Sequence, residues 1–187
     1  MRSFISNSVQ NMKPSGIRRY FDIAATMENV ITLGIGEPNF TTPEHIMRAG
    51  IDSLMAGKTA YTSNSGTIEL RRAISAHIER LYGVVYSPDD QVLVTVGVSE
   101  ALWLALKAVL DPGDEVLVVQ PCFVANAAAV EMAGGVPVIV NALIEDEFQV
   151  TGAQLEAAIT PKTKVILISY PNNPTGAILD REHMLQV

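Results

Sequence analysis

Hydrophobic residues in the second half of the chain follow two alternating patterns. Four short runs rich in β-branched residues are bounded by turn residues, which predicts buried strands. These runs cover residues 91–96, 115–120, 136–140 and 164–170. Stretches with helical spacing of apolar residues cover 99–110, 123–133 and 155–159, and another helix is expected from Asp180. Strands that alternate with helices are typical of parallel βαβ units, so the pattern predicts an α/β fold.

The first half of the chain predicts helices joined by loops. We expect an arm over residues 1–14, a helix over 15–27, a strand over 30–33 and helices over 43–57 and 68–82. Thr42 and Thr67 are expected to cap the last two helices, and Gly83 is expected to end the second. The later stretch over 99–110 is apolar on nearly every side, so we expect that helix to be buried.

Composition narrows the class of protein. The chain has 187 residues, 48% hydrophobic and 18% charged, so it is expected to fold as one sizeable domain with room for a small extra segment. A net charge of −7 disfavours binding to nucleic acid. No apolar run approaches the roughly 18 residues of a membrane span. Cys122 is the single cysteine, so a reducing, cytoplasmic location is expected.

The turn between the predicted strand at 91–96 and the next helix has the features of an anion site. Gly97, Val98 and Ser99 occupy it. The first N–H groups of a helix and its positive dipole end attract anions, and the Ser99 hydroxyl adds a donor. Gly97 allows a close approach to the backbone. The alternative is that Ser99 only caps the helix, which on local features alone is the commoner role.

The other candidate residues are ambiguous when each is taken alone. The run Asn172–Gly176 is typical of an ordinary turn. Taken alone, Phe123 is more often a core residue, and Tyr61 in a polar loop is more often a surface residue. The histidines are not spaced for metal ligation, so no metal is expected. The glycines that follow predicted strands do not complete a dinucleotide fingerprint, which disfavours a nicotinamide cofactor.

Five segments, taken in order, resemble the class I and II aminotransferases, which are pyridoxal-phosphate enzymes of fold type I. The segments are Gly36–Pro43, Tyr61 with Gly66–Arg71, Thr95–Leu102, Asp111–Asp114 and Pro171–Gly176. The resemblance implies a three-layer αβα fold with a mostly parallel sheet, incomplete in this chain. It assigns residues 1–40 to an N-terminal arm and small-domain segment. Residues 41–187 would be the first part of the cofactor-binding large domain.

The resemblance also implies which residues hold the cofactor, pyridoxal 5′-phosphate. Gly97, Val98 and Ser99 match the turn that binds its phosphate through backbone N–H groups and the hydroxyl. Phe123 matches an aromatic ring that stacks on the pyridine, and a flat apolar side chain suits that role. Asn173 matches the amide that donates to the pyridine 3′-oxygen.

Two further matches concern the substrate and a second subunit. Gly36 matches a residue whose backbone meets the substrate carboxylate. Tyr61 matches a tyrosine that reaches the cofactor phosphate of the partner subunit, so a homodimer with shared active sites is expected. The chain departs from the family at Asn39, where an acidic residue is common, and at Asn126, where an aromatic residue is frequent. Because of both departures, the sequence does not determine which substrate is bound.

The family's catalytic residues have no counterpart in this chain. Its Schiff-base lysine, the aspartate that keeps the pyridine nitrogen protonated and the arginine that binds the substrate carboxylate all follow the Asn-Pro-Thr-Gly turn. The lysines present here, which stand at other positions, are Lys13, Lys58, Lys107, Lys162 and Lys164. We therefore expect the truncated N-terminal portion of an aminotransferase, inactive alone and a weak binder of the cofactor at best.

The implied reaction transfers an amino group from an amino acid to a 2-oxo acid by ping-pong chemistry. Two alternatives stay open. A relative of the fold could be a non-catalytic effector-binding module, which a DNA-binding helix-turn-helix elsewhere in the gene product would favour. The parent could also be a pyridoxal-phosphate lyase or synthase of the same fold, because the residues that discriminate these reactions are missing.

Overall fold

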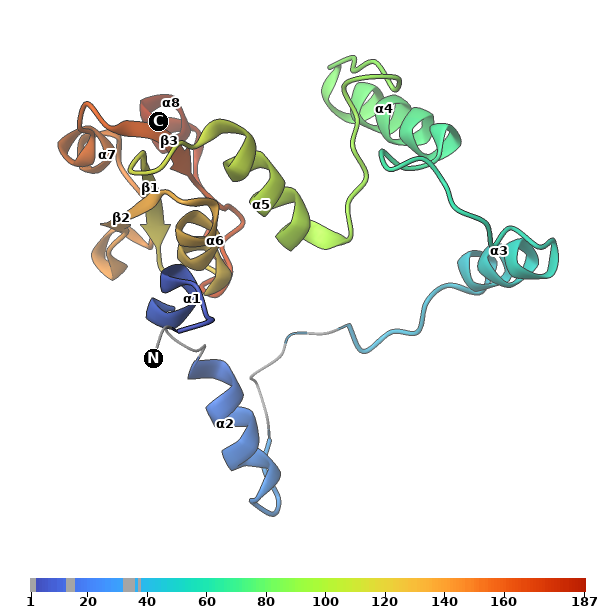
Figure 1. Ribbon diagram of the computed structural model, residues 1–187, viewed down its shortest axis with the longest axis horizontal. Coiled ribbons are helices and arrows are strands. Elements are labelled where there is room, and N and C mark those ends of the chain that lie inside the picture. The colour runs from blue at the N-terminus through green and yellow to red at the C-terminus, as the bar shows by residue number, and fades with distance from the viewer. Residues whose placement is uncertain (1–2, 13–15, 32–35, 37) are drawn as a thin grey trace. The chain divides into compact units, whose positions relative to one another are not determined.

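The computed structural model describes residues 3–12, 16–31, 36 and 38–187 (Figure 1). The chain divides into two compact units. The larger unit contains Met1–Pro14 and Val96–Val187, and the smaller unit contains Ser15–Thr95. These units are defined by contacts within the chain, and the predicted domain boundary at residue 40 remains a prediction.

A three-stranded parallel sheet forms the centre of the larger unit. Its strands are β1 (Glu115–Gln120), β2 (Val136–Asn141) and β3 (Thr163–Leu167), in the order β2-β1-β3. β1 pairs with β2 along its whole length, from Glu115 opposite Val136 to Gln120 opposite Asn141. Three of the four predicted strands are therefore confirmed, although β3 ends three residues earlier than the predicted Tyr170.

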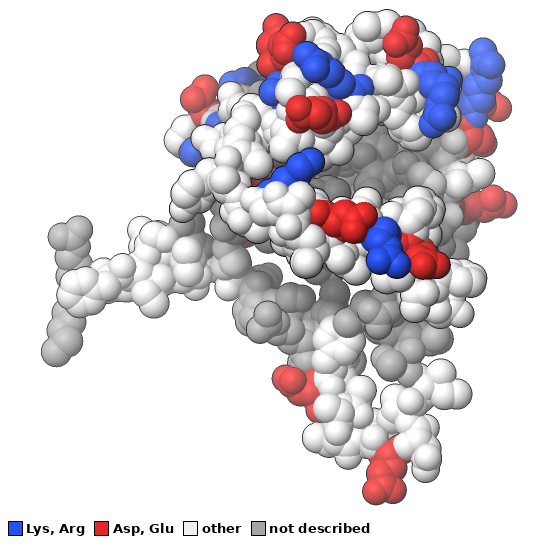
Figure 2. Space-filling model, turned by 90° about the vertical axis from the view of Figure 1, so that its right-hand side faces the viewer, with Lys and Arg blue, Asp and Glu red and all other residues white. Residues whose placement is uncertain are grey.

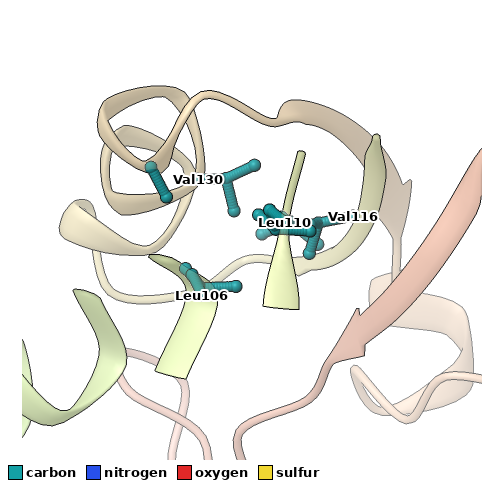
Figure 3. Packing of buried hydrophobic residues seen from close by; sticks show 6 residues of the cluster. Leu106, Leu110, Val116 and Val130 are labelled. Atoms are coloured by element: carbon teal, nitrogen blue, oxygen red, sulfur yellow. The ribbon is translucent and has the colours of Figure 1, made fainter. Parts of the chain in front are cut away.

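Helices cover both faces of this sheet, because the side chains of β1 alternate between two apolar clusters. Val116 and Val118 pack with residues of α5 (Gly97–Val109) and α6 (Ala125–Ala133). Figure 3 shows Leu106, Leu110, Val116 and Val130 meeting in this cluster. Leu117 and Val119 point to the opposite face and pack with α7 (Gly152–Ala158). The expected three-layer αβα arrangement is therefore confirmed.

Short elements complete the larger unit. They are α1 (Asn7–Asn11), the 3-10 helix η1 (Ile144–Asp146) and α8 (Arg181–Gln186). The Asp180 carboxylate caps α8 by accepting the His183 N–H at 2.9 Å, so the helix expected from Asp180 begins one residue later, at Arg181. Tyr170 links the segment after β3 to the loop before α7, because its hydroxyl donates to the Phe148 carbonyl at 2.7 Å and accepts the Val150 N–H at 3.1 Å. Burial raises the pKa of this hydroxyl, which keeps it protonated as a donor.

The smaller unit contains α2 (Gly16–Ala25), α3 (Glu44–Met55) and α4 (Ile68–Tyr82). Thr67 caps α4 by accepting the Leu70 N–H, and Gly83 ends it with a φ of 69°, so both predictions are confirmed. The prediction that Thr42 caps α3 is wrong. Pro43 occupies the N-cap position and no side chain caps the helix, because the chain turns into the helix one residue later than expected.

The two buried residues of α4 are polar, and its isoleucines are half-buried. The Arg71 guanidinium donates to the carbonyls of Gly66, Pro88 and Asp89, and Ser75 donates to the Tyr86 carbonyl. Both side chains are buried, whereas Leu70 on the same helix is 45% exposed. These hydrogen bonds hold the loop before α4 and the segment after it against one helix.

Two expectations for residues 91–110 are wrong. Residues 91–96 form no strand, because a strand needs a neighbour and this segment pairs with none of the three described strands. α5 is also not buried all round: Leu106 is its buried residue, whereas Trp103 is 39% exposed. Only the side of α5 that packs on α6 and β1 is covered. Of the predicted strand at 30–33, Val30 and Ile31 are irregular, and the other two residues lie outside the described ones.

An ion pair joins the turn before β1 to β3. Lys164 Nζ lies 2.9 Å from Asp114 Oδ2 and 3.4 Å from Asp111 Oδ2. The hydrogen bond from Lys164 lowers the pKa of the Asp114 carboxyl below its ordinary value, and the same bond raises the pKa of Lys164. The pair therefore stabilises the folded state only while Asp114 is ionised.

We expect this pair to make the chain acid-sensitive. Since the pKa of Asp114 is lower in the folded than in the unfolded state, its contribution is complete above the ordinary aspartate pKa of about 3.9 and is lost as the pH falls through the folded value. Asp114→Asn should thus reduce the fall in urea midpoint between pH 6 and pH 3. Glu145→Gln, on the exposed turn η1, is the control, and an equal effect of both variants would contradict the assignment.

Candidate functional site

A cavity of about 280 Å³ lies between the first turns of α5 and the face of α6 in the larger unit. Its walls include Val98, Ser99, Trp103, Phe123, Asn126 and Met132. Three of the predicted cofactor residues, Val98, Ser99 and Phe123, thus come together from two separate segments. Phe123 follows β1, so this end of the cavity adjoins the carboxyl end of the central strand, where ligands of parallel sheets bind.

The start of α5 does not have Ser99 as its N-cap, which was the alternative to an anion site. Val96 is the N-cap residue, no side chain caps the helix, and Ser99 lies in the first turn. The helix begins two residues before the predicted start, at Gly97, whose φ of 80° favours glycine. The interpretation of Ser99 as the cap is therefore wrong. Ser99 is exposed and lines the cavity, at the end of the helix that carries partial positive charge.

Glu100 contributes a negative group to the same turn. Its carboxylate accepts the backbone N–H of Val96. An acidic side chain in the first turn interacts favourably with the helix dipole. It also satisfies one of the donors at the helix start, so an anion in this cavity would bind to the Ser99 side and not to the Val96 amide.

Phe123 presents an apolar surface to the cavity. Its side chain is 45% exposed, so the ring is not the ordinary core residue of the alternative interpretation. The preceding turn contains a cis peptide bond between Gln120 and Pro121. The Phe123 carbonyl accepts the N–H of Asn126 at 3.0 Å, which fixes the turn to the start of α6.

Sequence reasoning treated Asn126 only as a departure from the family and did not assign it to a site. Its side chain is 8% exposed, lines the cavity and hydrogen-bonds to Cys122. Burial raises the pKa of the Cys122 thiol more than that hydrogen bond lowers it. The thiol is therefore protonated near neutral pH, which makes it a poor nucleophile.

Trp103 is a second lining residue that was not assigned. It follows Ser99 by one helical turn, as does Leu102, and residues three and four apart share a helix face. This spacing could have identified both residues once Ser99 was a candidate. Trp103 is also the single tryptophan of the chain, so its fluorescence reports on the cavity.

Asn173 lies near this region of the larger unit but does not line the cavity. It is exposed in the loop between β3 and α8. The neighbouring Asn172 is buried, and its Nδ2 donates to the Pro121 carbonyl at 2.8 Å. The loop that carries Asn173 is therefore tied to the turn that carries Phe123.

Gly36 and Tyr61 belong to the smaller unit. Both are exposed, and Tyr61 is exposed completely. Their predicted contacts, with a substrate carboxylate and with a partner subunit, remain predictions.

The described lysines do not line the cavity. Lys107 Nζ donates to the Ala133 carbonyl at the end of α6, at 3.2 Å, and Lys164 is paired with Asp114. Within the described ranges, no three acidic, histidine or cysteine side chains lie together as a metal site requires. None of the described helices combines the length and apolarity needed to cross a membrane. The face in Figure 2 carries basic and acidic residues side by side rather than a continuous basic patch.

Comparison with known proteins identifies the family. Residues 28–187 match the family described as aminotransferase class I and II. The chain belongs to this family. The resemblance inferred from five ordered motifs is thereby confirmed.

Individual relatives match all or nearly all of the chain. It is 48% identical over its full length to the YugH protein of Bacillus subtilis strain 168, and covers 48% of that protein. It is 40% identical to aromatic-amino-acid aminotransferase 2 of Thermococcus litoralis, with 98% of the chain and 47% of the relative covered. The structure of Thermus thermophilus aspartate aminotransferase with maleate is similar over the whole chain, with a TM-score of 0.91 and 38% identity, and 49% of that protein is covered. The chain thus spans about half the length of these relatives.

The position of Ser99 yields a prediction about stability. Because Ser99 is not a cap, Ser99→Ala should change the free energy of unfolding by less than about 0.5 kcal/mol. Thr151, in the same unit, does cap α7 and forms a capping box with Gln154, so Thr151→Ala should cost about 1 kcal/mol. Urea unfolding of both variants measures the difference. A loss at Ser99 as large as that at Thr151 would restore the capping interpretation.

Proposed function

We propose that this chain is the N-terminal portion of a pyridoxal-phosphate-dependent aminotransferase and supplies the part that binds the cofactor's phosphate and ring. The complete enzyme transfers an amino group between an amino acid and a 2-oxo acid. The single observation that supports the proposal most is the cavity that joins Ser99 to Phe123. It combines an anion-binding helix end with a flat apolar surface, and pyridoxal phosphate carries both a phosphate and a flat ring.

The residues present fit this group. Val98 and Ser99 would hold the phosphate in the first turn of α5, together with Gly97, and the dipole of the helix would stabilise its charge. Phe123 would stack on the ring. Asn173, exposed on the adjoining loop, would donate a hydrogen bond to the ring's 3′-oxygen. When bound, the cofactor supplies an acceptor for the electrons that an amino acid releases as its α-proton leaves.

The remaining assignments concern the complete enzyme. Gly36 would meet the substrate carboxylate through its backbone, and Tyr61 would reach the cofactor phosphate of the partner subunit in a homodimer. The complete exposure of Tyr61 supports a role outside its own unit. The single cysteine supports a reducing, cytoplasmic location. The relatives include an aromatic-amino-acid aminotransferase and an aspartate aminotransferase, so we propose the reaction without naming one amino donor.

We expect the chain to bind the ring and the phosphate together. Pyridoxine 5′-phosphate is a suitable probe because it lacks the aldehyde that would react with lysines. It should quench Trp103 fluorescence saturably, and Ser99→Ala and Phe123→Ala should each weaken binding about tenfold through the loss of about 1.4 kcal/mol. Phe40→Ala, at an exposed phenylalanine of the smaller unit, is the control. Equal quenching by pyridoxine without its phosphate would contradict the proposed site.

We also expect no specific covalent attachment of pyridoxal phosphate. Lys107 and Lys164 donate to a backbone carbonyl and to aspartates, and neither lines the cavity. Borohydride reduction of the chain mixed with pyridoxal phosphate, followed by peptide mapping, should therefore give only scattered labelling, and the chain should show no transaminase activity. One dominant labelled lysine would overturn this expectation.

A further inference from the structure

Asn172 differs from its neighbour Asn173 in burial. Asn172 is 8% exposed, whereas Asn173 is exposed. A buried amide is stable only when its donors and acceptor are hydrogen-bonded, and such an arrangement restrains the chain around it. The proposed function assigns a role to Asn173 and none to Asn172.

Both ends of the Asn172 side chain are hydrogen-bonded. Nδ2 donates to the carbonyls of Pro121 at 2.8 Å and Ser169 at 3.4 Å. Oδ1 accepts the backbone N–H of Thr175 at 3.1 Å and its hydroxyl at 2.8 Å. The side chain at position 172 must therefore offer a hydrogen-bond donor toward Pro121 and an acceptor toward Thr175.

The backbone of Asn172 closes the same loop. Its N–H donates to the Ala177 carbonyl at 2.8 Å, and its carbonyl accepts the Gly176 N–H at 2.8 Å. Together with the side-chain bonds to Thr175, these contacts fix the conformation of residues 172–177. Asn173 lies within this closed loop, so its backbone position depends on these contacts.

The contact with Pro121 joins two segments that are distant in sequence. Pro121 follows β1 directly, and the Asn172 loop follows β3, which is the neighbour of β1 in the sheet. Phe123 lies two residues after Pro121. One amide thus connects the turn of the proposed stacking residue to the loop of the proposed ring donor.

We propose that Asn172 is a positioning residue for the ring of the cofactor, acting through Asn173 and the turn of Phe123. This inference rests on the proposed function. It predicts that Asn172 determines the part of the affinity that comes from the ring, and not the part that comes from the phosphate, because its side chain hydrogen-bonds to Pro121, Ser169 and Thr175.

The hydrogen bonds at position 172 require an amide, so replacing Asn172 by aspartate, which has the same shape, is the sharpest test. In Asn172→Asp the shape is kept, but the ionised carboxylate has no donor for the Pro121 carbonyl and repels it. A protonated carboxyl regains one donor. Burial and the facing carbonyls should raise the pKa of the introduced carboxyl, so part of the function should return at moderately acidic pH.

The experiment measures two constants on the 187-residue chain by Trp103 fluorescence. One is the Kd of pyridoxine 5′-phosphate, and the other is the competition constant of inorganic phosphate. Asn172→Asp should raise the Kd of pyridoxine 5′-phosphate about tenfold and change the competition constant of inorganic phosphate by less than about twofold. Asn173→Ala should also weaken ring binding, and the double variant should lose less than the sum of the two single losses, because part of the effect of Asn172 passes through Asn173. The loss in Asn172→Asp, relative to wild type at each pH, should shrink between pH 7 and pH 5.

Thr175→Val serves as a milder variant if Asn172→Asp does not fold. It removes only the two hydrogen bonds of the Thr175 hydroxyl, which donates to Asn172 Oδ1 and accepts the Ala177 N–H. The Kd of pyridoxine 5′-phosphate should rise two- to threefold, and the competition constant of inorganic phosphate should stay unchanged. A folded Asn172→Asp or Thr175→Val chain with the wild-type Kd of pyridoxine 5′-phosphate overturns the positioning role, as does full additivity with Asn173→Ala. A wild-type chain that binds pyridoxine phosphate no better than inorganic phosphate overturns the proposed function, and this inference with it.

Discussion

Burial of β1 on both faces is the interaction on which the larger unit depends. Val116, Leu117 and Val118 are completely inaccessible to solvent, and their side chains alternate between the two helical layers. Each buried aliphatic side chain contributes about 1.5–3 kcal/mol of transfer free energy. Because β2 and β3 both pair with β1, the register of the sheet and the positions of α6 and α7 follow from this one strand.

The candidate site is built at the carboxyl end of this strand. The chain leaves β1 through Pro121 and Phe123, and α5 packs on the same layer as α6, so Ser99 and Phe123 come to share a cavity. Polar contacts then refine the position of the loops: Asn172 ties the segment after β3 to Pro121, and Tyr170 ties it to Val150. Apolar burial sets the location of the site, and hydrogen bonds set the orientation of its loops.

Prediction from the sequence succeeded where local signals and burial agree. β1 was predicted at its observed bounds because a strand buried on both faces has a continuous β-branched run. Thr67 and Gly83 were predicted as the ends of α4 because capping depends on residues within one turn. The predicted strand at 91–96 is wrong because a β-branched run indicates only that a segment suits a sheet, and this segment pairs with none of the three described strands. Asn126 and Trp103 were missed because neither belongs to a motif.

The sequence by itself determined the family, the order of strands and main helices over residues 97–187 and the residues suited to a phosphate and a flat ring, because these depend on residue type and spacing along the chain. Only the tertiary structure decided that Ser99 lines a cavity rather than caps a helix, and that Asn172 is the buried member of the pair and Asn173 the exposed one. These properties depend on which segments meet in space. Two adjacent residues of the same type carry no local signal that shows which of them is buried, and only the contacts of Asn172 with Pro121 and Thr175 decide it.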